Sequence, residues 1–339
     1  DRKPDVQTAG TDTNLHPTFH FILQKGGGDG HCHGSERVSG RGRQNTLPCA
    51  QLAVEGHFRT DSYDHNRHHP VDDQTVRSRG MRYLVRTSYN GAGFNGFQYQ
   101  MEGRTVQGEI EKILQRMHKV PVRIHPAGRT DSGVHAREQY FHFDTDLNIP
   151  EPKWQHALNS AMPGDIAIHE VRRISPDYHI RHHSEGKAYR YRIYQGEIRD
   201  PFERGLKTYY PYKLDEEKMR EAMQHFVGTH DFTSFSSAKS PIENKVRHIY
   251  RFDLIKTENG YDFLIIGSGF LYNMVRILVA YVLEVGQGRW EASRTPQIIE
   301  ARDRTLVPKT APPEGLYLER VFLDEASRNE ALEKYNLTR

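Results

Sequence analysis

The sequence predicts an α+β protein built from two ferredoxin-like halves, each with the element order βαββαβ and an antiparallel sheet. Two observations support this prediction. Segments with alternating apolar residues, typical of strands, are interspersed with segments whose apolar residues recur every three or four positions, typical of helices. The order of these segments is the same in residues 81–180 and in residues 181–325. Two such sheets would leave a cleft between them, where a ligand could bind.

The first half opens with an alternating strand from Met81 to Tyr89. A helix follows, because apolar residues recur on one helical face and Thr105 is a suitable N-cap. Pro121 ends this helix. The apolar face of the helix consists of Ile110, Ile113, Leu114 and Met117; the other expected elements are strands at about 122–125, 138–144 and 166–171, and a helix from about Pro152 with Trp154, Ala157, Leu158 and Ala161 on one side.

The second half repeats this order. The dipeptide Asn259-Gly260 favours a hairpin between two of its strands. The expected strands cover 188–194, 246–256, 261–267 and 316–323, and the expected helices cover 215–226, with Met219, Ala222, Met223 and Phe226 inward, 271–285 and 297–301. Residues 326–339 are expected to form a C-terminal tail.

The composition, 36% hydrophobic and 27% charged over 339 residues, is typical of a protein with a sizeable core and room for about two domains. The longest apolar run, Ile277 to Val285, is too short to span a membrane. The chain opens without a charged and then apolar leader, and Cys32 and Cys49 are its only cysteines, which disfavours a disulfide framework. We therefore expect a cytoplasmic protein. Its net charge of +3 is compatible with a nucleic-acid partner.

Residues 1–80 differ from the rest of the chain. They are rich in glycine and histidine, have no sustained period, and precede Met81, the first methionine. We interpret them as a disordered extension or as sequence upstream of the true start. The alternative is a metal-binding arm, although its histidines and cysteines match no standard zinc spacing. The candidate ligands would be His31, Cys32, His33, Cys49, His65, His68 and His69.

A glycine-bounded loop over 127–136 carries Arg129 and Asp131 between two predicted strands. Because alternate residues of an extended segment point to opposite sides, these two side chains need not neutralise each other. Asp131 could therefore meet a substrate. The alternative is that Asp131 merely closes the turn, as aspartate commonly does.

Tyrosines alternate with arginines over 187–194, so that Tyr189 and Tyr191 share one face of a strand and Arg190 and Arg192 the other. Exposed aromatic residues on a sheet stack bases, and arginines beside them contact phosphates. The alternative is that the tyrosines pack inward while the arginines reach solvent. The histidines of the preceding segment, 178–183, have no cysteine or carboxylate at ligand spacing, which favours a solvated or RNA-facing segment over a metal site.

Arg276 lies within an otherwise apolar helix and needs an anion, because burying an isolated charge is costly. A structural carboxylate elsewhere could supply it. The sharper hypothesis is Asp131, whose pKa such a partner would lower, keeping the carboxylate ionised near neutral pH.

The segment 91–96 fits the G-x-G-x-x-G pattern of dinucleotide sites. In those sites the helix begins within the glycines, and an acidic residue ends the second strand. Here the helix begins near Thr105 and the second strand ends at His125, so both tests fail. We expect a surface loop instead, with Arg104 able to contact phosphate.

The loop, the tyrosine strand and the apolar helix together resemble the core motifs of the TruA family of tRNA pseudouridine synthases. The resemblance runs in order from Met81 to Val321. Two positions depart from the family pattern, Asn90 and Phe97, where the family usually has Asp and Trp. The matching stretches are 127–136, 189–193, 270–276, 89–98, 231–235 and 314–318.

This resemblance implies isomerisation of uridine to pseudouridine at positions 38, 39 and 40 of the tRNA anticodon stem-loop. It implies Asp131 as the catalytic carboxylate, with Tyr189, Arg129, Arg276 and Leu271 binding the substrate. Asp131 could attack the sugar, add to the ring or remove a proton. The family also implies a homodimer with a central RNA-binding cleft, and neither a metal nor an organic cofactor. The alternative is a non-catalytic RNA-binding protein of the same fold.

Overall fold

A computed structural model describes residues 80–307 and 309–336. The chain divides into two compact units, 1–69 and 70–339, and all described residues belong to the second. The expected extension and the alternative metal-binding arm lie outside the described residues, apart from Gly80. In the described part, no helix has the length and apolar character needed to cross a membrane.

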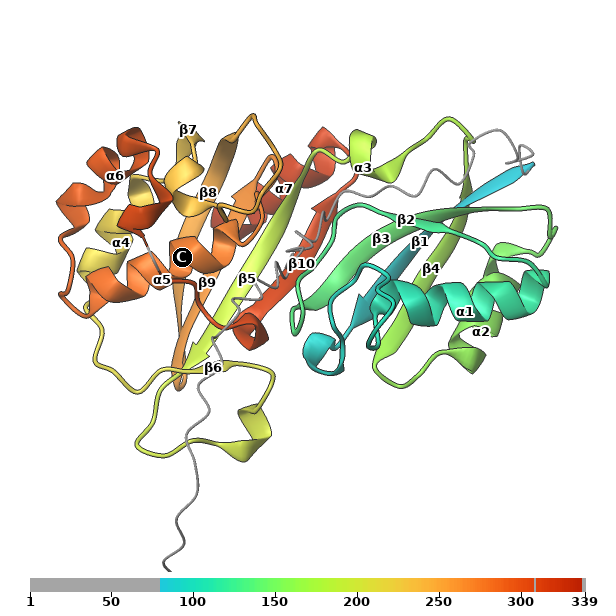
Figure 1. Ribbon diagram of the computed structural model, residues 1–339, viewed down its shortest axis with the longest axis horizontal. Coiled ribbons are helices and arrows are strands. Elements are labelled where there is room, and N and C mark those ends of the chain that lie inside the picture. The colour runs from blue at the N-terminus through green and yellow to red at the C-terminus, as the bar shows by residue number, and fades with distance from the viewer. Residues whose placement is uncertain (1–79, 308, 337–339) are drawn as a thin grey trace, which may run out of the picture. The chain divides into compact units, whose positions relative to one another are not determined.

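The described unit is an α+β structure organised on a ten-stranded sheet (Figure 1). The strand order is β4-β1-β3-β10-β5-β9-β8-β7, with β2 paired to β3 and β6 to β5. Neighbouring strands are antiparallel except in the pairs β3–β10 and β5–β6. The strands are β1 (Met81–Tyr89), β2 (Ile124–Pro126), β3 (His135–Thr145), β4 (Ile166–Ile174), β5 (Gly186–Tyr194), β6 (Thr208–Tyr209), β7 (Gly228–Asp231), β8 (Val246–Thr257), β9 (Gly260–Gly267) and β10 (Leu316–Phe322).

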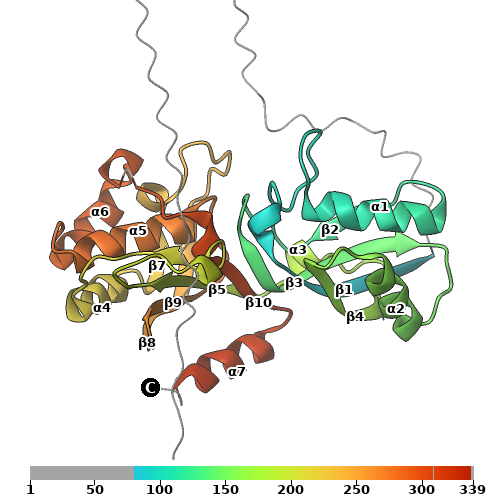
Figure 2. The ribbon, with the colours of Figure 1, turned by 90° about the horizontal axis from the view of Figure 1, so that it is seen from below.

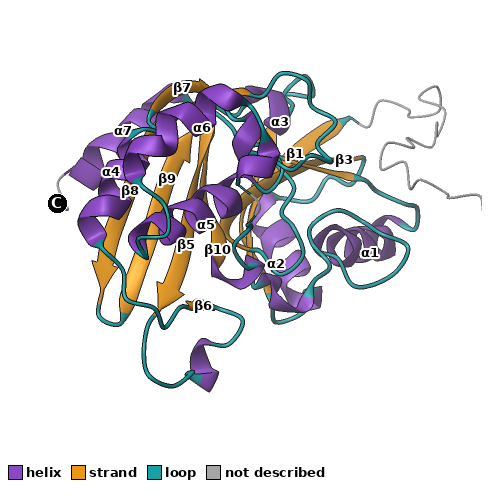
Figure 3. Ribbon diagram, turned by 60° about the vertical axis from the view of Figure 1, so that its left-hand side comes forward, coloured by secondary structure: helices purple, strands orange, loops and turns teal. Residues whose placement is uncertain are grey.

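Helices cover both faces of this sheet. In Figure 1, α1 and α2 lie in front of β1 to β4, and Figure 3 shows α5 lying over β5 and β9. Helix α7 lies on the opposite face from α1 and α5 (Figure 2). The helices are α1 (Val106–His118), α2 (Glu151–Ala161), α3 (Ile180–His183), α4 (Glu216–Gln224), α5 (Met274–Gly286), α6 (Thr295–Ala301) and α7 (Glu325–Asn336).

The expectation of two separate sheets is wrong, because the two halves share one sheet. Strand β10 pairs in parallel with β3 through Tyr317 opposite His135 and Leu318 opposite Ala136. This pairing satisfies backbone groups that two separate sheets would leave at open edges. It also brings the start of β3, directly after the Asp131 loop, into the middle of the sheet beside β10 and β5.

Strand β9 is buried along its whole length, from Gly260 to Gly267. Helix α5 covers one face, and on the other face α7 contributes to a small apolar cluster around Ile266 and Phe322. The expected C-terminal tail therefore contains a helix that completes this second layer. The cluster consists of Ala188, Ile266, Phe322 and Ala331, with Tyr250 and Leu332 against it.

Most predicted elements occur at the predicted positions. The Thr105 side chain caps α1 by accepting a hydrogen bond of 3.1 Å from the Gly108 amide, and β8 and β9 form the predicted hairpin. Two details differ. Ala161 is exposed at the end of α2, and α5 begins at Met274 rather than at Leu271, because Asn273 adopts a left-handed backbone with φ of 61°.

Candidate active site

The Asp131 loop joins β2 to β3 and is held by the segment that follows β1. The Phe97 amide donates to the Thr130 carbonyl at 3.0 Å, and the Gly133 amide donates to the Phe94 carbonyl at 3.2 Å. The hydroxyl groups of Tyr89 and Thr130 lie 2.8 Å apart in a buried hydrogen bond. The loop is therefore fixed on both sides of Asp131 by backbone and side-chain hydrogen bonds.

The glycines of the G-x-G-x-x-G segment permit this close approach. A Cβ atom on Gly91 would lie 2.0 Å from the Val134 carbonyl oxygen, and Gly96, with φ of 90°, lies against the backbone at Thr130. Both glycines are buried, so the expectation of a simple surface loop is wrong for them. Arg104 forms a bidentate pair with Asp165 at 2.5 and 2.9 Å, which occupies the guanidinium that we had expected to contact phosphate.

Substituting Gly91 by alanine is expected to displace the Asp131 loop and to lower both activity and melting temperature, because the added methyl group would overlap the Val134 carbonyl. Gly93→Ala is the matched control, since its nearest atoms lie at 3.7 and 3.8 Å. Thermal unfolding and initial rates of the two variants provide the measurement. Equal behaviour of the two variants would show that Gly91 does not support the loop.

The structure contains the Asp131–Arg276 ion pair that the apolar helix required. The Nη1 atom of Arg276 lies 3.3 Å from Oδ2 of Asp131. The guanidinium also donates to Oδ1 of Asn273 at 3.0 Å and to the Ala311 carbonyl at 2.7 Å. Arg276 is thus fixed by three acceptors from three segments, and it holds the carboxylate in place.

Asn273 was not predicted to take part. Its left-handed backbone is uncommon for a residue other than glycine, and it aims the side-chain amide oxygen at Arg276. An asparagine three residues before the buried arginine was the available sequence signal, because asparagine tolerates this conformation better than most residues.

As predicted, the charge and hydrogen bond of Arg276 lower the pKa of Asp131. Burial has the larger effect, however, and raises that pKa above its ordinary value. The carboxylate is therefore more basic than an exposed aspartate, a property that suits proton transfer or attack on an electrophile.

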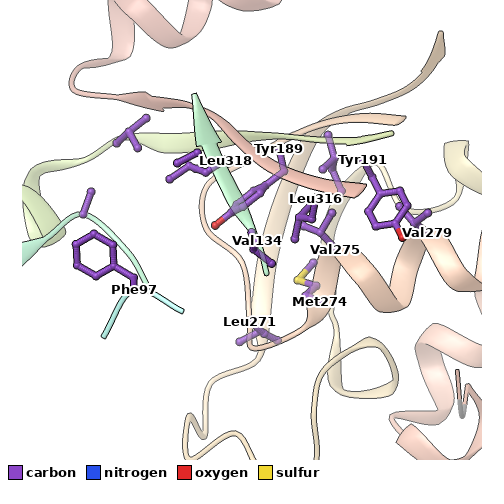
Figure 4. Packing of buried hydrophobic residues seen from close by; sticks show 14 of the residues in the cluster. Phe97, Val134, Tyr189, Tyr191, Leu271, Met274, Val275, Val279, Leu316 and Leu318 are labelled. Carbon is purple, nitrogen blue, oxygen red and sulfur yellow. The ribbon is translucent and has the colours of Figure 1, made fainter. Parts of the chain in front are cut away.

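Tyr189 of β5 is buried close to this pair. The charge of Asp131 contributes to raising the pKa of Tyr189, after a larger effect of burial. Its ring contacts Phe270 edge to face, with the ring centroids 5.1 Å apart. Figure 4 shows Tyr189 and Leu271 among the buried residues that also include Val134 of the loop. Leu271, 4% exposed, lies just before α5 in this cluster.

The two faces of β5 are as predicted, but the arginines are not available for phosphate. Tyr189 and Tyr191 are buried. Arg190 and Arg192 both pair with Asp262 of β9, at 3.2 and 3.4 Å. The alternative in which the tyrosines pack inward thus describes most of the strand. The arginines do not simply reach solvent, because they neutralise a carboxylate on the neighbouring strand.

A different group of cations lies near the loop. Arg129 is exposed as a residue, but the protein still removes part of the water around its guanidinium. This partial burial, followed by the charge of Arg181, lowers the pKa of Arg129. Burial together with Arg181 and Arg247 lowers the pKa of Lys187 to about 8. A Cβ atom on Gly128 of the loop would lie only 3.1 Å from the Lys187 Nζ.

We call Arg129, Arg181, Lys187 and Arg247 the basic cluster. Within the described residues no carboxylate forms an ion pair with any of its four members. The sequence identified Arg129 as a site residue and placed Arg181 and Lys187 within the segments 178–183 and 187–194. It gave no signal for Arg247. Cations that have no carboxylate partner in the described part of the chain are suited to an anionic ligand.

Comparison with known proteins identifies the family of this chain. The family model described as tRNA pseudouridine synthase matches residues 87–182 and 222–324. The tRNA pseudouridine synthase A of Staphylococcus saprophyticus is 58% identical over 243 residues, which are 72% of this chain and 91% of the relative. The protein of the same name from Staphylococcus aureus is 55% identical over 255 residues, which are 75% of this chain and 94% of the relative.

Among solved structures, the archaeal box H/ACA sRNP Nop10-Cbf5 complex aligns with 58% of this chain and 45% of the matched chain. The TM-score of 0.26 and the identity of 14% are too low to bear on the fold. The family model instead matches the segments that carry Asp131, Arg129 and Arg276. The chain therefore belongs to the tRNA pseudouridine synthase family.

Proposed function

We propose that this enzyme isomerises uridine to pseudouridine at positions 38, 39 and 40 in the anticodon stem-loop of tRNA. The observation that carries the proposal is the Asp131–Arg276 pair, held in a fixed loop beside Tyr189. The relatives named tRNA pseudouridine synthase A support tRNA as the substrate. The anticodon positions follow from the resemblance to the TruA family.

The reaction rearranges one nucleotide. The C1′–N1 glycosidic bond breaks, the uracil turns while it is held, and a C1′–C5 bond forms. C5 then loses its proton and N1 gains one, so that neither water nor a redox partner is consumed. One carboxylate is enough for this chemistry, whereas glycosidases usually use two. In our proposal Asp131 is the catalytic residue that contacts the nucleotide.

The target base must leave the helical stack to reach Asp131, because that carboxylate lies in a part-buried loop. Tyr189 and Leu271 provide aromatic and apolar surface beside it, and we assign them to contact the extruded base. Arg276 is a positioning residue that holds the carboxylate. Arg129 lies two residues from Asp131 and has no carboxylate partner in the part of the chain that the structure describes. We assign it to the phosphate of the extruded nucleotide.

The basic cluster is assigned to the RNA backbone. Lys187→Ala is expected to weaken tRNA binding and to reduce the slope of log affinity against log salt concentration by about 1. Because burial lowers the pKa of Lys187 to about 8, wild-type affinity should fall as the pH rises through that value, when the ammonium loses its proton. The variant should lack this fall.

Lys153→Ala is the matched control for that experiment, since Lys153 is an exposed lysine on α2. Filter-binding titrations at several salt concentrations and pH values give the slopes and affinities. If Lys187→Ala binds tRNA with the salt slope and pH dependence of Lys153→Ala, Lys187 does not contact the RNA backbone.

We propose that residues 81–180 and 181–325 each form one ferredoxin-like unit and that the two units are fused through β3 and β10. The strand orders β4-β1-β3-β2 and β10-β5-β9-β8 support this proposal. We further propose that the protein acts in the cytoplasm as a homodimer with an RNA-binding cleft, as the TruA family does. Light scattering on the purified chain tests the dimer, and a monomeric mass would exclude it.

The proposed activity is tested with a tRNA transcript that carries uridine at positions 38, 39 and 40. Carbodiimide adducts mapped by primer extension should reveal pseudouridine at those positions after incubation with the enzyme. Transcripts with cytidine at each position in turn are the controls. Tight binding without any conversion would support the alternative, a non-catalytic RNA-binding protein. Conversion only outside the anticodon arm would refute the assignment of positions 38, 39 and 40 as the target uridines.

A further inference from the structure

Three histidines from separate segments meet on one side of the sheet. His125 of β2 and His142 of β3 are directly opposite in the strand register, and their rings stack with centroids 5.0 Å apart. His179, at the N-cap of α3, lies against both rings, at 5.8 Å from His125 and 4.7 Å from His142. One imidazole nitrogen from each residue lies within 4.8 Å of the other two. Three rings that lie far apart in the sequence therefore converge on one point.

Two ring nitrogens of this cluster have no hydrogen-bond partner. The Nδ1 atoms of His142 and His179 are buried, and neither forms a hydrogen bond within the described part of the chain. His142 as a whole is only 1% exposed. A buried polar nitrogen without a partner is costly, and native proteins leave few of them. A bound ligand that accepts nitrogen lone pairs would remove this cost.

An unpaired cation next to the three rings would repel a metal ion. The nearby guanidinium of Arg82 is neutralised by a bidentate pair with Asp144, at 2.6 and 2.8 Å.

We propose that His125, His142 and His179 form a binding site for a zinc ion, with solvent as its fourth ligand. Imidazole suits zinc, and three histidines with an open position are a known coordination set. Zinc–nitrogen bonds of about 2.0 Å place ligand nitrogens about 3.3 Å apart. The ligand nitrogens, now within 4.8 Å of one another, must therefore close in by up to about 1.5 Å, which small side-chain rotations can supply.

The site would fix the connector, residues 175–185, which links β4 to β5. Arg82 already anchors this connector by donating to the Tyr178 carbonyl at 3.0 Å. His179 precedes Arg181 by two residues, so a bound ion would help to hold Arg181 next to Arg129 in the basic cluster. The sequence predicted no metal, because the three histidines lie in segments whose spacing matches no zinc motif.

The experiment uses the full chain, stripped of metal with a chelator. Calorimetry reports the binding of zinc, and absorption reports the binding of cobalt in its place. The variants are His125→Ala and His179→Ala, which avoid the core position of His142. His156→Ala is the matched control, because His156 is an exposed histidine on α2. Circular dichroism establishes that each variant is folded, and thermal unfolding with and without zinc gives a second readout.

We expect wild type and His156→Ala to bind one equivalent of zinc at this site. His125→Ala and His179→Ala should bind that equivalent at least about tenfold more weakly. Zinc should also raise the melting temperature of the first two proteins more than that of the cluster variants. All four proteins contain residues 1–79, so metal bound by the histidines and cysteines of that segment contributes equally to each. The difference in zinc binding between the variants therefore reports the three-histidine site alone. Equal stoichiometry and affinity in all four proteins, or loss in only one cluster variant, would overturn the proposal.

Discussion

Replacing Asp131 by asparagine is expected to lower the rate of pseudouridine formation by at least about 10³-fold while leaving the fold intact. Asparagine keeps the shape of the side chain and can still accept a hydrogen bond from Arg276, but it can neither attack nor remove a proton as a carboxylate does. Single-turnover rates with excess enzyme over tRNA give the measurement, because they separate chemistry from product release.

The free energy of unfolding of this variant should be compared with that of wild type at low and at neutral pH. The difference should favour the variant at neutral pH at least as much as at low pH. Burial raises the pKa of Asp131 in the folded state, so the wild type loses stability as the pH rises through that pKa, and the asparagine does not. Glu300→Gln is the matched control, since Glu300 is an exposed carboxylate on α6. A variant at Asp131 that retained the rate of this control would exclude Asp131 from the chemistry.

Replacing Arg276 by alanine is expected to lower the rate by about 10²-fold, because the partner of a part-buried charge is lost and the loop carboxylate is no longer held. The cation lowers the pKa of Asp131, so its removal should raise that pKa further. The acid limb of the pH–rate profile, where Asp131 becomes protonated and inactive, should therefore move to higher pH.

Arg276→Lys should be intermediate, because a lysine keeps the charge but cannot reach the Asp131 carboxylate, the Ala311 carbonyl and the Asn273 amide together. Arg220→Ala, at an exposed position of α4, is the control. Rates recorded across the acid range for the three variants provide the test. An acid limb that stays at the wild-type pH in Arg276→Ala would mean that the pair does not control the carboxylate.

The elements of the fold could be predicted where the signal is local. The Thr105 cap, the helical spacing in α1 and α4, and the Asn259-Gly260 hairpin depend on neighbouring residues. The parallel pairing of β3 with β10 could not, since it joins His135 to Tyr317 and has no local pattern. Helix α7 was not predicted either, because its residues show no clear apolar face.

The site could be predicted in part for a similar reason. A buried arginine demands an anion whatever the fold, so charge predicted a partner for Arg276 but did not decide between Asp131 and another carboxylate. The structure supplies Asp131, from 145 positions away. The net pKa shift of Asp131 did not follow, because it depends on how deeply the folded chain buries the carboxylate. The basic cluster and the three histidines are likewise assembled by the fold from distant segments.

The most direct measurement is a map of pseudouridine in the anticodon arms of tRNA from cells that lack this gene, complemented with wild type or with Asp131→Ala. Carbodiimide adducts detected by primer extension report each position. We predict that wild type restores pseudouridine at positions 38, 39 and 40 and that Asp131→Ala, produced at the same level, restores none. Restoration by the variant would contradict the assignment of Asp131 as the catalytic carboxylate.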